Sequence, residues 1–107
     1  MDKINLVFEA LSSTPRRRIL SYLSATSLTA GEIAERFEMS KPALSKHLKI
    51  LQTADLIMGE KKGQFMHYSL NRDNLVTSLA DFTANFCPVG SVIKKESKLI
   101  AENNKGN

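Results

Sequence analysis

The most constraining feature of this chain is a pair of short helical patterns with almost nothing between them. Thr29 and Glu32 form a capping box, and apolar residues follow at helical spacing, which predicts a helix over residues 29–37. Ser40 is a preferred N-cap residue and begins a second predicted helix, over residues 40–53. Helices joined by so short a turn cannot lie antiparallel, so they must cross steeply. The sequence therefore predicts a helix-turn-helix.

The second helix of this pair has two unlike faces. The apolar arc of its helical wheel holds Ala43, Leu44, Leu48, Ile50, Leu51 and Ala54. The opposite arc is rich in hydrogen-bond donors and holds Lys41, Pro42, Ser45, Lys46, Lys49, Gln52 and Thr53. The helix is therefore expected to pack on one side and to present a donor-rich surface on the other.

After Asp55 the sequence pattern changes from helical to alternating. Residues 65–70 alternate between two faces as a strand does, and an apolar run at residues 56–58 precedes them. The intervening KKGQ, residues 61–64, is typical of a turn. These features predict a β-hairpin with a basic tip directly after the helix-turn-helix.

Apolar stripes predict helices on both sides of this region. Residues 3–11 carry one stripe, and a second helix begins at Ser13 and ends near residues 24–27. A last helix begins at Asn71 or Asp73. The predicted fold class is thus mostly α with a small β-hairpin, in the order α-α-α-α-β-β-α, which is a winged helix-turn-helix.

The length of the chain suits one domain. Its 107 residues can bury a small core without disulfides or metals. Pro88 and Gly90 stop the last helix of this domain, which we expect to span residues 1–90. Residues 91–107 form a polar tail, in which a short helix over residues 91–101 stays open and the asparagine-rich end is expected to be disordered.

Cysteine usage and hydropathy indicate the compartment. Cys87 is the only cysteine, so no disulfide can form within the chain, which fits a reducing environment. No apolar run approaches the roughly 20 residues that cross a bilayer, and the start lacks the layout of a signal peptide. We expect a cytoplasmic protein without membrane insertion. Cys87 is interpreted as a structural thiol, with an intersubunit disulfide or a redox-sensing thiol as the alternative.

Positive charge is concentrated in the middle third of the chain. The formal net charge is +4, and residues 40–72 hold six basic and two acidic side chains while the rest is balanced. A localised basic patch is the usual footprint of a polyanionic partner. Charge alone fits a solvated lysine face equally well.

The predicted helix-turn-helix and hairpin are elements that bind DNA, which explains why the basic residues are concentrated in them. The major groove of DNA accepts one helix, and the first turns of a recognition helix meet the base edges. The basic hairpin tip would reach the phosphate backbone or the adjacent minor groove. We therefore predict that double-stranded DNA is bound by Ser40, Lys41, Pro42, Ser45, Lys46, Lys49, Lys61, Lys62 and Gln64.

Two other functions stay open from the residues alone: a winged helix used as a protein-interaction module, and a nonspecific architectural DNA binder. An enzyme is not expected. The chain has no glycine-rich phosphate loop and no plausible metal cluster, and its cysteine has no base partner at a recognisable spacing.

Three consecutive arginines and one histidine need partners: the arginines for their positive charge, and the histidine for its place on an apolar face. Arg16, Arg17 and Arg18 lie at the N-terminal end of a helix, where the helix dipole disfavours positive charge. An acidic neighbour such as Glu9, or DNA phosphate, must compensate, and the internal partner is favoured. His47 lies in the apolar arc, which favours a packed, hydrogen-bonded histidine over a base contact.

Three segments carry a resemblance to a known family: FEALSSTPRRRILSYL, LTAGEIAERFEMSKPALSKHLKIL and KKGQFMHYSLN. They resemble the ArsR family of bacterial winged-helix repressors, and most closely its small autorepressor branch, the SdpR-like proteins. The resemblance implies a recognition helix at residues 40–53, repression at a promoter, its own or a neighbouring one, and a homodimer formed by the first and last helices. A dimer would bind a pseudo-palindromic operator. The expected dimerisation residues are Ile4, Val7, Phe8, Leu75, Leu79, Phe82 and Phe86.

The sequence departs from the family pattern in two places. The second helix starts with Ser13-Thr14-Pro15 instead of an acidic cap and proline, although the proline still falls in the first turn. A Cys-x-Cys metal site of the family is replaced by residues 29–31, and no histidine follows His67. We therefore predict neither metal sensing through these arrangements nor any cofactor.

Overall fold

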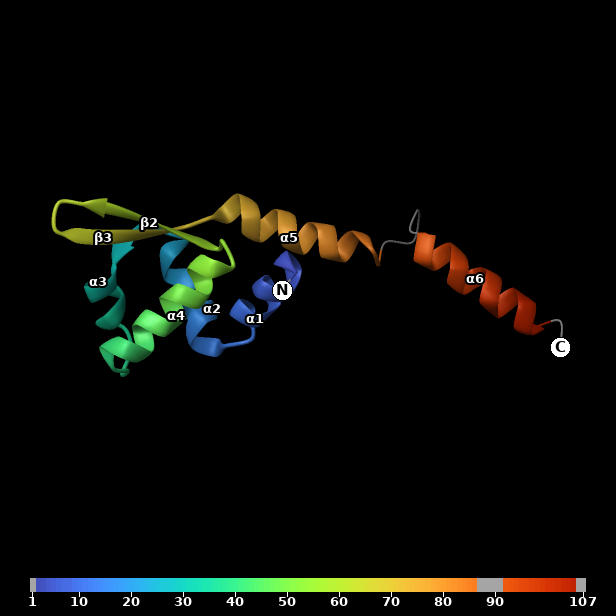
Figure 1. Cartoon of the computed structure of the whole chain (residues 1–107), viewed down its shortest axis with the longest axis horizontal. Coiled ribbons are helices and arrows are strands. Elements are labelled where there is room, and N and C mark those ends of the chain that lie inside the picture. The colour runs from blue at the N-terminus through green and yellow to red at the C-terminus, as the bar shows by residue number, and fades with distance from the viewer. Residues whose placement is uncertain (1, 87–91, 106–107) are drawn as a thin grey trace.

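The structure, a computed structural model, describes residues 2–86 and 92–105, and the side chains of residues 92–94 and 105 are not described. The prediction that the thiol of Cys87 is structural, and the stop at Pro88 and Gly90, lie outside the described residues. Figure 1 shows the elements in order. They are α1 (Lys3–Leu11), α2 (Thr14–Leu23), β1 (Leu28–Thr29), α3 (Ala30–Ala34), α4 (Lys41–Thr53), β2 (Ile57–Lys62), β3 (Phe65–Leu70), α5 (Arg72–Ala84) and α6 (Val92–Lys105).

Helices α3 and α4 form the predicted helix-turn-helix. The capping box is present, because the Thr29 hydroxyl accepts from the Glu32 amide and a Glu32 carboxylate oxygen accepts from the Thr29 amide at 2.9 Å. Ser40 caps α4 by accepting from the amide of Ala43. Helix α3 ends at Ala34, earlier than the predicted residue 37. The chain tightens there into i→i+3 hydrogen bonds, including Phe37 amide to Ala34 carbonyl at 3.1 Å.

The hairpin belongs to a three-stranded antiparallel sheet in the order β1-β3-β2. Strand β1 was not predicted, since its two residues are too few to show alternation; Leu28 and Thr29 pair with Tyr68 and His67. Strand β2 also runs further than predicted. Lys61 and Lys62 were assigned to the turn but lie in β2, and the turn is only Gly63-Gln64, with Gly63 at a φ of 63°.

A left-handed residue separates α4 from the sheet. Asp55 has a φ of 59°, and the amide of Leu56 reaches back to the carbonyl of Leu51 at 3.0 Å, which ends the helix as a Schellman motif. The carbonyl of Asp55 accepts from the side-chain amides of Asn71 and Asn74. The end of α4 is thereby tied to the start of α5, which Asn71 caps.

One hydrophobic core joins α1, α2, α3, α4 and the base of the hairpin. Its buried members are Val7, Ala10, Ile19, Leu20, Leu23, Ile33, Leu44, Leu48, Leu51, Ala54, Leu56 and Ile57. Helix α2 forms despite its unusual first residues, because Ser13 accepts from the amide of Arg16 and the proline occupies the first turn.

Helix α6 projects beyond α5, away from the rest of the molecule (Figure 1). Its described side chains, residues 95–104, are exposed. The short helix left open over residues 91–101 is present as α6, which begins at Val92 and continues to Lys105, through part of the end that was expected to be disordered. Residues 106 and 107 of that end lie outside the described residues. In the described part of the chain, no helix combines the length and apolar character required to cross a membrane.

Candidate nucleic-acid interface

The N-terminal half of α4 presents an exposed polar surface. Leu44, Leu48 and Leu51 pack into the core, which turns the opposite side of the helix toward solvent. The predicted DNA-binding residues on this helix are all exposed: Ser40, Lys41, Pro42, Ser45, Lys46 and Lys49. Pro42 lies in the first turn, where a missing amide proton costs little. The predicted division of α4 into a packed and a free side is confirmed.

The opposite flank of α4 is fixed by an arginine that lies almost entirely inside the protein. Arg16 Nη1 lies 3.2 Å from Nδ1 of His47, Nε donates to the carbonyl of Ala10 at 2.9 Å, and Nη2 donates to the carbonyl of Glu9 at 2.8 Å. The prediction of a packed, hydrogen-bonded His47 is confirmed. The predicted internal compensation of Arg16 exists, but it comes from carbonyls at the end of α1 and not from the Glu9 carboxylate.

The contact between Arg16 and His47 defines the state of the histidine. An arginine can only donate, so Nδ1 of His47 accepts and the ring proton of the neutral form resides on Nε2. Burial, and next the guanidinium of Arg16, lower the pKa of His47 from its ordinary 6.5. The neutral histidine connects α4 to α1 through the buried side chain of Arg16.

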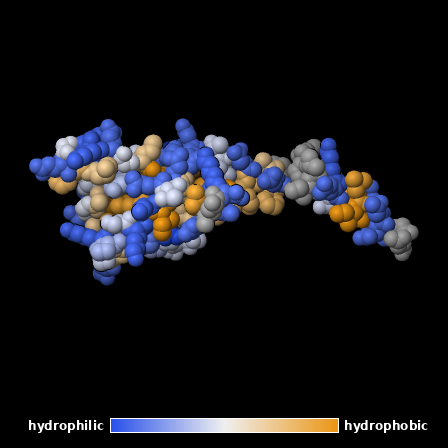
Figure 2. All heavy atoms as spheres, in the orientation of Figure 1, coloured by the Kyte–Doolittle hydropathy of each residue, from blue (hydrophilic) through white to orange (hydrophobic). Residues whose placement is uncertain are grey.

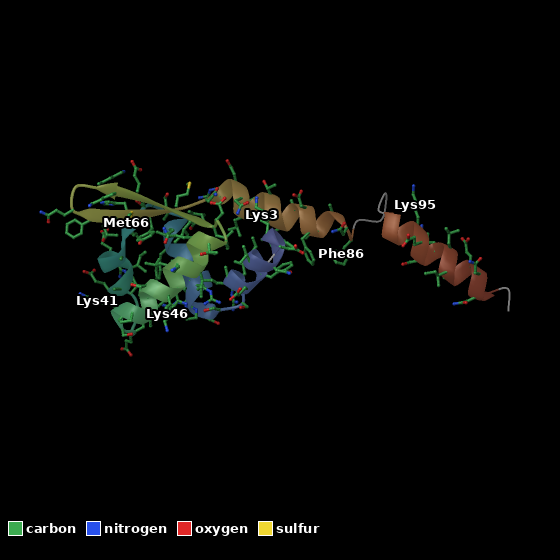
Figure 3. All side chains as sticks on the ribbon, viewed as in Figure 1. Lys3, Lys41, Lys46, Met66, Phe86 and Lys95 are labelled. Atoms are coloured by element: carbon green, nitrogen blue, oxygen red, sulfur yellow. The ribbon has the colours of Figure 1, made fainter. Side chains whose placement is uncertain are left out.

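The hairpin carries its basic residues to the same end of the molecule as the start of α4. Lys61, Lys62 and Gln64 are exposed. In Figure 3 the labelled Lys41 and Lys46 of α4 and Met66 of the hairpin all lie at the end remote from α5 and α6. Figure 2 shows hydrophilic residues dominating that end. The predicted DNA-binding residues of both elements are thus brought to one end of the fold.

An aromatic residue at the hairpin tip was missing from the predicted site. Phe65 is 62% exposed and directly opposes Lys62 across the strands, so both side chains lie on one face of the hairpin. The alternating pattern correctly predicted a strand here. It gave no sign that the outer face of that strand would leave a phenyl ring in solvent.

The residues predicted for dimerisation fall into three groups. Val7 is fully buried in the core of this chain, so the prediction is wrong for its side chain, which is not available to a partner. Ile4, Leu75 and Leu79 are half-buried. The three phenylalanines are exposed and form a continuous edge-to-face series: Phe8 to Phe82 at 4.8 Å and Phe82 to Phe86 at 5.1 Å between ring centroids.

No group of three or more histidine, cysteine or acidic residues comes together within the described residues. The absence of metal sensing stays a prediction.

A helix-turn-helix with a free, donor-rich second helix and a basic hairpin beside it is the architecture of a DNA-binding transcriptional regulator. Residues 11–60 match the family model described as a helix-turn-helix domain. The chain is 46% identical, over 81% of its length and 96% of the relative, to the transcriptional repressor SdpR of Bacillus subtilis. It is 34% identical to the arsenical resistance operon repressor of Staphylococcus xylosus, covering 68% of this chain and 70% of that one.

A solved ArsR-like transcriptional regulator from Rhodococcus sp. RHA1 has the same fold. Its TM-score is 0.73 at 26% identity, covering 95% of this chain and 91% of that one. This chain belongs to the ArsR family of winged helix-turn-helix transcriptional repressors, as its sequence resemblance implied. It is a transcriptional regulator and not an enzyme.

Proposed function

We propose that the protein is a homodimeric repressor that acts in the bacterial cytoplasm on a pseudo-palindromic operator in its own or a neighbouring promoter. The observation that carries this proposal is the separation of two surfaces on one chain. The exposed polar side of α4 and the basic hairpin lie at one end, while the exposed phenylalanine series comes from α1 (Phe8), α5 (Phe82) and the segment just after α5 (Phe86). One surface suits DNA and the other suits a second copy.

In the proposed complex, the first two turns of α4 lie in the major groove. Ser40, Lys41, Pro42, Ser45 and Lys46 face the base edges and nearby phosphates, and the free amides at the helix start favour an anion. Lys49, Lys61, Lys62 and Gln64 contact the phosphate backbone or the adjacent minor groove. Serine and lysine at the base edges supply discrimination, whereas the hairpin lysines supply affinity for any sequence.

In the proposed dimer, Phe8, Phe82 and Phe86 meet the same residues of a second copy, supported at the margins by Ile4, Leu75 and Leu79. Exposed aromatic rings that already stack on one another form a preorganised apolar surface. A twofold dimer would set two recognition helices about 34 Å apart, one turn of DNA. We take residues 1–90 as the domain that performs this function and residues 91–107 as a tail.

The proposal is tested by titrating the purified protein against two duplexes at two salt concentrations. One duplex is the DNA upstream of its own coding sequence, and the other is a scrambled duplex of equal composition. We expect tighter binding to the upstream DNA and a slope of about −0.9 in log K against log salt for each neutralised phosphate. Equal affinity for both would indicate architectural binding, and no binding even at low salt would indicate a protein-interaction module; either overturns the proposal.

A further inference from the structure

The hairpin tip carries an apolar side chain, that of Phe65, which has no role in the proposed contacts of lysine, serine and glutamine with DNA. Phe65 is 62% exposed, although a phenyl ring in water forgoes the stabilisation that burial would give. It lies directly beside the Gly63-Gln64 turn, at the tip of the hairpin. A Cβ placed at Gly63 would meet no atom within 4 Å, which shows that the tip is open.

The register of the hairpin places this ring beside a cation. Phe65 pairs with Lys62, and Met66 pairs with Lys61, so each face of the tip carries one apolar side chain and one lysine. The face bearing Phe65 is turned away from the core, because the other face holds the buried Ile57. Figure 2 shows hydrophobic spheres among the hydrophilic ones at this tip.

The base of the hairpin is held firmly against α4. A Cβ at Gly59 would lie only 3.1 Å from Nε2 of Gln52 on α4 and 3.2 Å from Sδ of Met66. The absence of a side chain at Gly59 lets the hairpin pack closely on the recognition helix and leaves Met66 turned toward that contact. Of the two apolar side chains at the tip, Phe65 is the more exposed, at 62% against 40% for Met66.

We propose that Phe65 is a wedge that enters the minor groove next to the major-groove site of α4, separates one base step and bends the duplex. This inference rests on the proposed function and deepens it. Apolar side chains flanked by cations are the groups that insert between base pairs in the minor groove, and the ring gains burial there. Lys61 and Lys62 pair with the phosphates on either side of the groove. Flexible pyrimidine–purine steps are the expected position of the bend.

The test measures bending directly, by energy transfer between dyes at the two ends of a duplex. The probe is a duplex enriched from a random-sequence pool by the wild-type protein. Wild-type protein should shorten the distance between the dyes, and 2-aminopurine at the bent step should brighten. Phe65→Ala should abolish both signals and weaken binding to this duplex about tenfold, with an unchanged salt slope. Phe65→Leu, which keeps an apolar wedge, should retain most of the bend.

Two matched variants separate the wedge from general effects. Met58→Ala truncates another exposed apolar residue on the same face of the hairpin, far from the tip, and should leave bending and affinity unchanged. Lys62→Ala should keep the bend and reduce the salt slope by about 0.9. Thermal melting of each variant checks the fold, and the exposed position of Phe65 predicts little change.

The outcomes distinguish this inference from the proposed function. A wild-type protein that binds its duplex without bending it, or a Phe65→Ala variant that bends it fully, overturns the wedge and leaves the repressor intact. Equal loss of bending in Met58→Ala also overturns it. A wild-type protein that enriches no duplex overturns both.

Discussion

At the scale of single residues, Arg16 and His47 show how a charged side chain can be structural inside a DNA-binding domain. The guanidinium satisfies two carbonyls at the end of α1 and donates to His47 on the buried side of α4. It therefore fixes the orientation of α4 against α1 without using its charge on DNA. The sequence favoured an internal partner for Arg16, Arg17 and Arg18 over DNA phosphate, and the fold identifies that partner for Arg16.

This contact makes stability depend on pH. The pKa of His47 is lowered in the folded protein from its ordinary 6.5, because burial and Arg16 disfavour the imidazolium. The unfolded chain then binds more protons than the folded one between the two values, so stability rises with pH. The contribution of His47 to the free energy of unfolding is full above its ordinary pKa of 6.5 and decreases as the pH falls through that value. It stops changing once the pH is below the lowered pKa of the folded protein.

We expect urea unfolding midpoints of the wild-type protein to fall between about pH 7 and pH 5, and those of His47→Asn to fall less, since the amide oxygen can accept from Arg16 without titrating. Glu32 also has a lowered pKa, from hydrogen bonds to the backbone and hydroxyl of Thr29, but its ordinary value of 4.5 is below this window. Unfolding midpoints that fall equally with pH in the wild-type protein and in His47→Asn would show that His47 is not the cause of the pH dependence.

At the scale of elements, the predictable features were those with a local chemical signature. The Thr29-Glu32 box, the Ser40 cap and the alternating sequence of residues 65–70 each lie within a few residues. The box and the cap are present in the structure, and residues 65–70 form the strand β3. Tertiary contacts decided the rest. Strand β1 exists only because β3 lies beside it, and β2 keeps its pairing through Lys62 because the turn needs just two residues.

The capping box at Thr29 is expected to hold the helix-turn-helix in place, since α3 has only five residues and little helical stability of its own. Thr29→Ala removes the acceptor for the Glu32 amide and should lower the free energy of unfolding by about 1 kcal/mol. Thr29→Ser keeps the hydroxyl and should lose much less. Chemical denaturation of both variants measures this difference. If Thr29→Ala and Thr29→Ser lower the free energy of unfolding equally, the loss comes from the threonine methyl group or from pairing in β1, and not from the hydroxyl.

At the scale of the whole molecule, α5 connects the proposed DNA-binding surface to the proposed dimer surface. It begins at Arg72, directly after β3, and carries Phe82 near its other end. Its start is tied to the end of α4 by the Asn71 and Asn74 hydrogen bonds to Asp55. A partner packed against the phenylalanines therefore determines, through α5, where each hairpin and recognition helix lies.

The aromatic surface could be predicted as a stripe on the sequence, but the inward orientation of Val7 could not, because both faces of α1 carry apolar residues.

The proposed dimer predicts that a charge on the aromatic surface disconnects the two copies without unfolding either. Phe86 is 67% exposed, so Phe86→Asp should change the melting temperature of the monomer little, while burial of an unpaired carboxylate at the dimer interface is strongly unfavourable. Sedimentation should show a monomer, and affinity for the operator should fall at least tenfold because each half-site is then bound alone. Leu99→Asp, an equally apolar-to-acidic change at an exposed site on α6, is the matched control and should stay dimeric. A Phe86→Asp protein that sediments as a dimer, or a Leu99→Asp protein that becomes monomeric, would show that the dimer interface is not the surface formed by the three phenylalanines.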